Sequence, residues 1–345
     1  MKVLIFSPAF YPNVGGLEAV VAMIAEGLSI LDCKVKVVTT TFGSGDDSAF
    51  TYEVIRSPSV SELLALVRWC DVFFHHNVSL KGLWPLLFVH RPWVVAHHGW
   101  YTRTDGTLGW QDRLKRFAAR FAINIAVSQA VADHLPVVCT VIPNPYWDDL
   151  FRLLPDIKRD RELVFLGRLV SDKGCDLLLE ALALLAAQGL RPALTIIGNG
   201  PEEERLIAQA RSLEIADQIV FAGKKTGEEL VKLLNQHTIM IIPSRWNEPF
   251  GIVALEGIAC GCHVIASSGG GLPEAIGACG VTFPNGDPQT LASRIAEALQ
   301  HPEKLERCHM NAAIHLARHN RAVVSHAYYD VLSKVVSARS QGAGA

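Results

Sequence analysis

The stretch Pro243-Ser-Arg-Trp-Asn-Glu-Pro-Phe-Gly-Ile-Val-Ala-Leu-Glu256 carries two glutamates, Glu248 and Glu256, with seven residues between them. A helix is predicted to begin just after Glu248, with Pro249 suited to its first position, and Glu256 then lies about two turns further on. A helix start offers unpaired N–H groups and a positive dipole end to an anion or to a hydroxyl-rich ligand. Two isolated glutamates are more often a helix-terminal charge and a solvated side chain, so the rest of the sequence decides their role.

Short apolar runs alternate with amphipathic helical stretches on both sides of this segment. Solid apolar strands between amphipathic helices indicate parallel sheets that are covered on both faces, which is an α/β fold. The predicted strands are 3–6, 35–39, 71–75, 93–97, 124–127, 138–142, 163–166, 194–197, 219–221, 239–242 and 263–266. The predicted helices are 16–30, 111–122, 175–187, 202–213, 228–235, 251–260 and 288–300.

The alternation is interrupted once, between Asn144 and Arg161, by a stretch that is rich in turn residues and then in charges. Such a stretch is typical of an interdomain linker, and a chain of 345 residues is long enough for two domains. We therefore predict an N-terminal domain over residues 1–156 and a C-terminal domain over residues 157–321, which would leave a cleft between two α/β halves.

The composition excludes several classes of protein. Hydrophobic residues make up 50% and charged residues 19% of the chain, which excludes intrinsic disorder. The formal net charge of −2 leaves no overall basic surface for nucleic acid. The eight cysteines form no Cys-x-x-Cys pair and suit buried, reduced thiols of a cytoplasmic protein. No apolar run approaches the roughly 20 residues of a membrane-spanning helix, so we expect a soluble chain that at most associates with a membrane.

Several motifs, in order along the chain, resemble one family. The glutamate pair, followed by Ala259-Cys-Gly261 and Gly269-Gly-Gly-Leu-Pro-Glu274, resembles the C-terminal signature of retaining glycosyltransferases of family four. Further matches are Phe6-Ser-Pro8, Gly15-Gly16, Gly167-Arg168-Leu169, Lys173-Gly174 and Gly198-Asn-Gly-Pro-Glu202. The chain departs from the family pattern at Gly257-Ile258, where Ala-Met is usual, and at Cys262-His263-Val264, where Pro-Val is usual. Both departures fall on apolar packing positions.

The resemblance implies the GT-B fold, in which two Rossmann-like domains with parallel sheets face each other across a cleft. The first domain would bind the acceptor and the second the nucleotide sugar, and a last helix over about 322–338 would cross back to the first domain. The implied activity is transfer of a sugar from a nucleotide-diphosphate sugar, with UDP favoured, to a hydroxyl acceptor with retention at the anomeric carbon. The acceptor would be a lipid-linked, polysaccharide or other glycoconjugate precursor.

The resemblance also assigns roles to residues. Arg168 and Lys173 would hold the donor diphosphate, Arg168 as a fork and Lys173 as a point charge. Glu248 would bind sugar hydroxyls, Glu256 the ribose, and His98 the sugar. The implied catalytic set is His98, Arg168, Lys173 and Glu248, and the implied donor-binding set is Gly15, Gly16, Gly198, Asn199, Phe250, Gly251, Ile252 and Glu256. No metal and no cofactor is expected, because two cations would neutralise the diphosphate.

Histidines fall at the ends of two predicted strands, as His75-His76 and His97-His98. Metal binding is disfavoured because no acidic or cysteine ligand lies at suitable spacing nearby. His97 is predicted to be buried and hydrogen-bonded, whereas His76 with Asn77 either lines the acceptor side of the cleft or is structural. A second histidine pair, His315 and His319, lies four residues apart on a helix and is expected on a solvated face.

A basic amphipathic segment spans residues 103–121. Its cations are Arg103, Arg113, Lys115, Arg116 and Arg120, against Asp105 and Asp112, and its apolar residues Trp110, Leu114, Phe117 and Phe121 share one helical face. Two explanations stay open: contact with anionic lipid through Trp110, Arg113, Lys115, Arg116 and Phe117, or a helix that packs its apolar residues inward and solvates its cations. The first would place the protein at the inner face of the plasma membrane.

Three other functions are compatible with this architecture. A nucleotide-sugar epimerase would need additional acid/base carboxylates in the cleft. A phosphorylase similar to glycogen phosphorylase would need a lysine-bound pyridoxal phosphate. A non-catalytic nucleotide-sugar-binding subunit is disfavoured by the intact set of Arg168, Lys173, Glu248 and Glu256.

Overall fold

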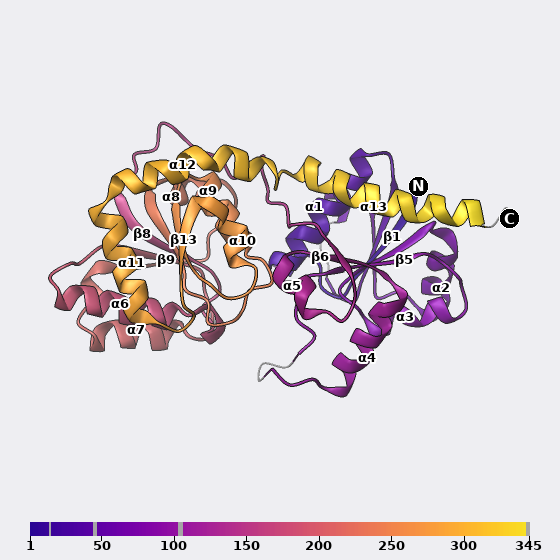
Figure 1. Ribbon diagram of the computed structural model, residues 1–345, viewed down its shortest axis with the longest axis horizontal. Helices are drawn as coiled ribbons and strands as arrows, with labels where there is room; N and C mark the ends of the chain where they lie inside the picture. Colours follow the sequence, from indigo (N-terminus) through magenta and orange to yellow (C-terminus); the bar gives the residue numbers. More distant parts are fainter. Residues whose placement is uncertain (14, 44–46, 103–105, 343–345) are drawn as a thin grey trace. The chain divides into compact units, whose positions relative to one another are not determined.

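The computed structural model describes residues 1–13, 15–43, 47–102 and 106–342 and divides the chain into two compact units (Figure 1). Unit 1 consists of Met1–Pro145 together with the chain from Asn320 onward, and unit 2 of Tyr146–His319. The boundary therefore falls earlier than the predicted position after residue 156. The reason is packing: Tyr146 N donates to His319 O, and Leu154 N donates to Asn235 Oδ1, so residues 146–155 belong to unit 2.

Unit 1 is built on a seven-stranded parallel sheet in the order β3-β2-β1-β4-β5-β6-β7. The strands are β1 (Lys2–Ser7), β2 (Lys34–Thr39), β3 (Glu53–Arg56), β4 (Val72–His76), β5 (Trp93–His97), β6 (Ile123–Ala126) and β7 (Cys139–Val141). The helices are α1 (Gly16–Ile30), α2 (Val60–Trp69), α3 (Leu80–Leu83), α4 (Trp110–Ala118), α5 (Gln129–His134) and α13 (Arg321–Gly342), with short turns η1 (Asp47–Ala49), η2 (Trp84–Leu87) and η3 (Ala119–Phe121). The chain thus winds outward from β1 on one side and from β4 on the other.

Unit 2 repeats this plan with a six-stranded parallel sheet in the order β10-β9-β8-β11-β12-β13. The strands are β8 (Arg161–Leu166), β9 (Leu194–Ile197), β10 (Ile219–Gly223), β11 (His237–Ile242), β12 (His263–Ser267) and β13 (Gly280–Phe283). The helices are α6 (Cys175–Ala187), α7 (Glu203–Ser212), α8 (Gly227–Asn235), α9 (Ile252–Ala259), α10 (Leu272–Ile276), α11 (Pro288–Gln300) and α12 (Pro302–Ala317), with turns η4 (Ser171–Lys173), η5 (Ala216–Gln218) and η6 (Gly277–Cys279). The predicted α/β class with two parallel sheets is confirmed.

Both sheets are covered on two faces, which explains their solid apolar strands. In unit 2, α6, α7 and α11 pack on one face around a core that includes Leu163, Phe165 and Leu178. In unit 1, α2 packs on one face through Leu63 and Val67. The opposite face carries α1 and α13, which lie side by side (Figure 1).

Helix α13 belongs to the core of unit 1 although it is the last helix in the sequence. Its Tyr328 is fully buried, with the ring centroid 5.7 Å from that of Phe74 on β4. Its Ser325 lies against Gly27 of α1, where a Cβ atom would collide with the serine side chain. A glycine at position 27 therefore lets the two helices approach closely.

A buried aromatic cluster surrounds His75 at the centre of unit 1. The imidazole stacks on Phe6 with a centroid distance of 5.1 Å, and it meets Phe73 and Trp93 edge-on at 4.3 and 5.6 Å. Neither ring nitrogen of His75 has a hydrogen-bond partner among the described residues. Burial lowers the pKa of His75 to about 3, so this side chain is a neutral ring in an apolar site.

His75 should make unit 1 sensitive to acid. The pKa of His75 is about 3 in the folded state and near its ordinary value of 6.5 in the unfolded state. As the pH falls from 6.5 toward 3, only the unfolded state binds the proton, so the free energy of unfolding decreases. We predict that His75→Phe reduces the loss of unfolding free energy between pH 7 and pH 5 by about 2 kcal/mol. Urea unfolding of both proteins at the two pH values measures this, with the exposed His90→Phe as the matched control. An unchanged loss in His75→Phe would contradict the assignment.

Candidate functional site

The carboxyl ends of β8 and β11 meet at the point where the winding of unit 2 reverses. From β8 the chain continues through α6 to β9 on one side, and from β11 through α9 to β12 on the other. Crossovers that diverge in this way leave a crevice at the carboxyl ends of the strands, which is where such sheets bind ligands. The predicted residues Arg168, Lys173 and Glu248 all follow these two strands.

Backbone contacts hold the loop after β8 against the loop after β11. The carbonyl oxygen of Asp172 accepts hydrogen bonds from Arg245 N at 2.9 Å and Trp246 N at 3.2 Å. Gly174 has a φ of +67°, and a Cβ atom there would collide with the carbonyl oxygen of Pro243. Glycine is therefore required at this position, and the close approach fixes Lys173 beside the loop that carries Glu248.

Lys173 and Glu248 form an ion pair between the loops that follow β8 and β11. The distance between Lys173 Nζ and Glu248 Oε1 is 2.5 Å, and the Ser244 hydroxyl donates to the same oxygen at 2.9 Å. Only 14% of the Glu248 side chain is exposed. Among the described residues no partner engages Oε2 of Glu248, so this oxygen is available to a ligand. Ser244 is not among the residues predicted from the sequence; its signal is a small hydroxyl residue at the carboxyl end of a parallel strand.

The backbone of Glu248 is extended rather than helical. It forms a parallel bridge with Gly270, and its carbonyl oxygen accepts a hydrogen bond from Gly271 N at 2.7 Å. Helix α9 begins only at Ile252, after Gly251 with a φ of +110°. The prediction that Pro249 occupies the first helical position is therefore wrong, because the bridge to Gly270 keeps this segment out of the helix.

Two predicted ligand groups in unit 2, Arg168 and Glu256, have no hydrogen-bond or ion-pair partner among the described residues. The Arg168 side chain is exposed, and its guanidinium contacts no acceptor within the described part of the chain. The Glu256 side chain on α9 is half-buried, and burial raises its pKa to about 7. The loop of Gly198 and Asn199 lies beside Arg168, since Leu169 N donates to Asn199 O at 2.9 Å. A Cβ atom at Gly198 would collide with the carbonyl oxygen of Gly167.

Phe250 and Ile252, which complete the predicted donor-binding set, differ in exposure. Ile252 is partly exposed at the start of α9, whereas the Phe250 side chain is buried against the ring of His319 with a centroid distance of 5.5 Å. His319 is itself buried, and His315 Nε2 lies 2.8 Å from Ala275 O. The expected solvated face for these two histidines is therefore wrong: His315 on α12 contacts α10, and His319, which follows α12, packs against Phe250.

In unit 1 the structure brings His76, Asn77 and His98 together. The Nδ1 atom of His76 lies 2.9 Å from Nε2 of His98, and the two rings stack with an interplanar angle of 17°. Asn77 adopts a φ of +63° and accepts a hydrogen bond from His98 N at 2.8 Å. Burial lowers the pKa of His98 to about 3 and that of His76 well below its ordinary value. The pair is thus neutral, with one nitrogen donating and the other accepting.

His97 is buried and hydrogen-bonded, as predicted. The Asn124 side-chain amide donates hydrogen bonds to the carbonyl oxygens of Ala119 and Ala122. Its Oδ1 therefore faces His97 and accepts a hydrogen bond from His97 Nε2 at 2.9 Å. The other ring nitrogen then accepts from the Tyr101 hydroxyl at 2.7 Å. His97 therefore has a structural role. No group of three or more His, Cys, Asp or Glu that could hold a metal ion occurs in the described ranges.

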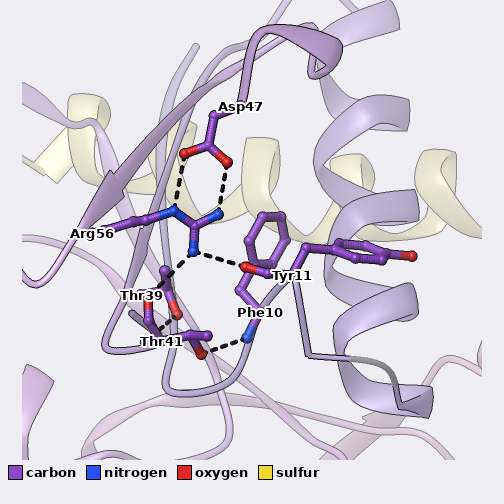
Figure 2. A network of polar contacts seen from close by, with 6 residues as sticks. All are labelled: Phe10, Tyr11, Thr39, Thr41, Asp47 and Arg56. Atoms are coloured by element: carbon purple, nitrogen blue, oxygen red, sulfur yellow. Dashed lines mark hydrogen bonds and ion pairs between the residues drawn. The ribbon is translucent and has the colours of Figure 1, made fainter. Parts of the chain in front are cut away.

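The glycines predicted to contact the donor in unit 1 lie at the start of α1. Gly15 has a φ of −171°, an extended conformation that any residue adopts, and Gly16 begins the helix. The preceding loop is held by Arg56, whose guanidinium donates to Asp47 Oδ1 and Oδ2 at 2.7 and 3.0 Å and to Tyr11 O at 2.7 Å (Figure 2). Arg56, which is also not among the residues predicted from the sequence, connects β3 to this loop.

Nearly the whole chain shares the fold of solved glycosyltransferase structures. The UDP complex of Alr3699/HepE from Anabaena matches 97% of this chain and 100% of its own, with a TM-score of 0.81 and 22% identity. Two Rossmann-like units of this kind define the GT-B class of fold. Residues 150–315 match the family described as glycosyl transferases group 1. This match lies entirely within unit 2.

Curated relatives match over parts of their length. Glycogen synthase from Mycobacterium tuberculosis is 36% identical over 148 residues, which are 42% of this chain and 36% of the relative. D-inositol 3-phosphate glycosyltransferase from Thermobispora bispora is 36% identical over 169 residues, which are 46% of this chain and 39% of the relative. The chain thus aligns with less than half the length of these relatives.

Asn77 offers a direct test of the geometry around His98. Asn77→Gly keeps the positive φ but loses the acceptor for His98 N–H, whereas Asn77→Ala loses both. We expect unfolding free energies lowered by about 1 kcal/mol for the glycine variant and by about 2 to 3 kcal/mol for the alanine variant. Asn77→Asp, which tolerates this backbone and keeps the acceptor, is the matched control. Equal stabilities for the alanine and glycine variants would contradict the backbone assignment.

Proposed function

We propose that the protein transfers a sugar from a nucleotide-diphosphate sugar to a hydroxyl acceptor, with retention at the anomeric carbon. The observation that carries this proposal is the convergence of Lys173, Glu248 and the unpaired Arg168 at the carboxyl ends of β8 and β11. UDP is the favoured nucleotide, since the fold neighbour from Anabaena is a UDP complex. The match of residues 150–315 to the group 1 family supports the same activity.

The donor diphosphate would bind between Arg168 and Lys173. Arg168 presents an exposed fork with no competing partner among the described residues. Lys173 would exchange its ion pair with Glu248 Oε1 for the diphosphate, while the Ser244 hydroxyl keeps Glu248 hydrogen-bonded. Two cations then stabilise the charge that develops on the departing nucleotide diphosphate. On this proposal no metal and no cofactor is needed for that task.

The remaining residues of unit 2 would orient the donor. Glu256 would accept hydrogen bonds from the ribose hydroxyls, since its carboxyl is half-buried and has no partner in the described part of the chain. Glu248 would accept from a sugar hydroxyl through its unengaged Oε2. The N–H groups of Phe250 and Gly251 and the first turn of α9, from Ile252, would donate to other sugar hydroxyls.

The chemical step exchanges one bond at the anomeric carbon. The bond from this carbon to the phosphate oxygen breaks, a bond to the acceptor oxygen forms on the same face, and the acceptor proton passes to the leaving phosphate. In this scheme no side chain serves as a covalent nucleophile. By resemblance to the family, Gly15 and Gly16 are assigned to the phosphate or acceptor and His98 to the sugar, with His76 and Asn77 positioning His98.

The diphosphate clamp is tested by Lys173→Ala. We expect turnover to fall at least about 100-fold, because one preorganised charge donor is removed. The unfolding free energy should fall by about 1 to 3 kcal/mol, because the largely buried Glu248 carboxylate loses its cation and keeps only the Ser244 hydroxyl. Conversion of UDP-glucose and an acceptor is followed at saturating donor, with the exposed Lys224→Ala as the matched control. Turnover close to the wild-type value in Lys173→Ala would refute the clamp.

The same assay tests the reaction class. Activity should persist in EDTA, because Arg168 and Lys173 would neutralise the diphosphate without a metal ion. The product should keep the anomeric configuration of the donor. Activity that is lost in EDTA and restored by manganese would contradict the proposed mechanism. An epimer formed from donor alone would favour the epimerase.

The raised pKa of Glu256 predicts a pH-dependent donor affinity. The carboxyl is mostly protonated below its pKa of about 7 and ionised above it, and the ionised form is the better acceptor for two ribose hydroxyls. The affinity for UDP-glucose should therefore fall by up to about tenfold per pH unit below pH 7 and stay constant above it. Calorimetric titration measures this, and Glu256→Gln should bind weakly with no such dependence. An equally steep dependence in Glu256→Gln would assign the titration to another group.

A further inference from the structure

Helix α4 and the turn η3 carry an apolar stripe that faces away from unit 1. The exposed fractions of Trp110, Phe117 and Phe121 are 69, 54 and 73%, and Leu114 is exposed to 44%. The inward side of the segment is formed by the small residue pair Ala118 and Ala119, which are buried. A surface helix of a soluble domain normally turns its apolar stripe toward the core. The alternative in which this helix packs its apolar residues inward is therefore wrong.

The cations of the segment divide into two groups. Lys115 Nζ lies 5.9 Å from the centre of the Tyr101 ring, and Arg116 is half-buried, with Nη1 shielded from solvent. Arg113 and Arg120 are exposed, and Arg120 Cζ lies 5.9 Å from the Phe117 ring centre. Lys115 and Arg116 thus contact unit 1, whereas the two arginines flank the apolar stripe. Two more residues of the predicted basic segment, Arg103 and Asp105, lie outside the described residues.

We infer that this surface docks on a lipid bilayer whose headgroups are anionic. The α4 surface, as we call it, consists of Trp110, Arg113, Leu114, Phe117, Arg120 and Phe121. Aromatic and leucine side chains insert at the boundary between headgroups and acyl chains, and arginines beside them meet the lipid phosphates. Within the described residues no helix is long and apolar enough to cross a bilayer, so the contact is a peripheral one.

Charge complementarity selects a bilayer with anionic headgroups over a neutral one. The chain as a whole carries a formal net charge of −2, which disfavours general adsorption to an anionic surface. Attraction must therefore be local, and it comes from the two outward arginines at the apolar stripe. Two further apolar residues flank the stripe in the sequence: Leu108 before it and Ile123 after it, with exposed fractions of 39 and 43%. This inference goes beyond the proposed function and does not depend on it.

Co-sedimentation with vesicles tests the inference on the full chain. One set of vesicles contains phosphatidylcholine alone, and in the other part of it is replaced by phosphatidylglycerol. The wild-type chain should bind only the anionic vesicles, and binding should weaken as salt shortens the Debye length from about 10 Å at 0.1 M to about 3 Å at 1 M. Arg113→Ser with Arg120→Ser should weaken partitioning about 30-fold, or about fivefold per cation. Trp110→Ser with Phe117→Ser and Phe121→Ser should weaken it at least about tenfold.

Matched controls come from exposed residues elsewhere in unit 1. Phe42→Ser removes an aromatic side chain that is 84% exposed, and Lys34→Ser with Lys81→Ser removes two exposed cations. Both controls should bind vesicles as the wild-type chain does, and UDP binding should be intact in every variant, which separates this test from that of the proposed function. Negligible binding of the wild-type chain to both vesicle types would overturn the inference. So would wild-type binding by the arginine or aromatic variant, or self-association through this surface without vesicle binding.

Discussion

The ion pair between Lys173 and Glu248 depends on a constraint of parallel sheets. Because β8 and β11 are neighbours whose crossovers leave in opposite directions, their carboxyl ends hold two loops side by side with no helix between them. Short backbone contacts through Asp172 and Gly174 then fix the spacing of these loops. A cation and an anion that are far apart in the sequence are thereby held 2.5 Å apart, in a place that a phosphate and a sugar could occupy.

Unit 1 has the same sheet topology, but the side chains at the carboxyl ends of its central strands are neutral rather than charged. Its central strands β4 and β5 end at His76 and His97, and His98 follows; burial keeps all three neutral, so this edge of the sheet presents hydrogen-bonding groups rather than charges. In unit 2 the corresponding edge carries Arg168, Lys173 and Glu248. In the proposed function, the charged edge of unit 2 would hold the diphosphate, on which negative charge builds as its bond to the sugar breaks.

The sequence predicts most of the fold because the central strands are uninterrupted apolar runs, and α1, α6 and α11 have the bounds that their patterns indicate. The missed strands β3 and β13 are both edge strands with partly exposed residues, so they lack such a run. A local sequence pattern does not show which side chains at the ends of different strands contact each other, such as His76 and His98. It also does not show that the bridge between Glu248 and Gly270 makes α9 begin only at Ile252. Periodicity identified the apolar stripe of α4 but not which side of the helix faces the core.

The most direct test of the account is a crystal structure of the chain with UDP. We expect a diphosphate within hydrogen-bonding distance of both the Arg168 guanidinium and Lys173 Nζ, with the ion pair to Glu248 opened and the ribose hydroxyls hydrogen-bonded to Glu256. A nucleotide bound away from the carboxyl ends of β8 and β11, or a diphosphate that leaves Lys173 paired with Glu248 and touches neither cation, would contradict it.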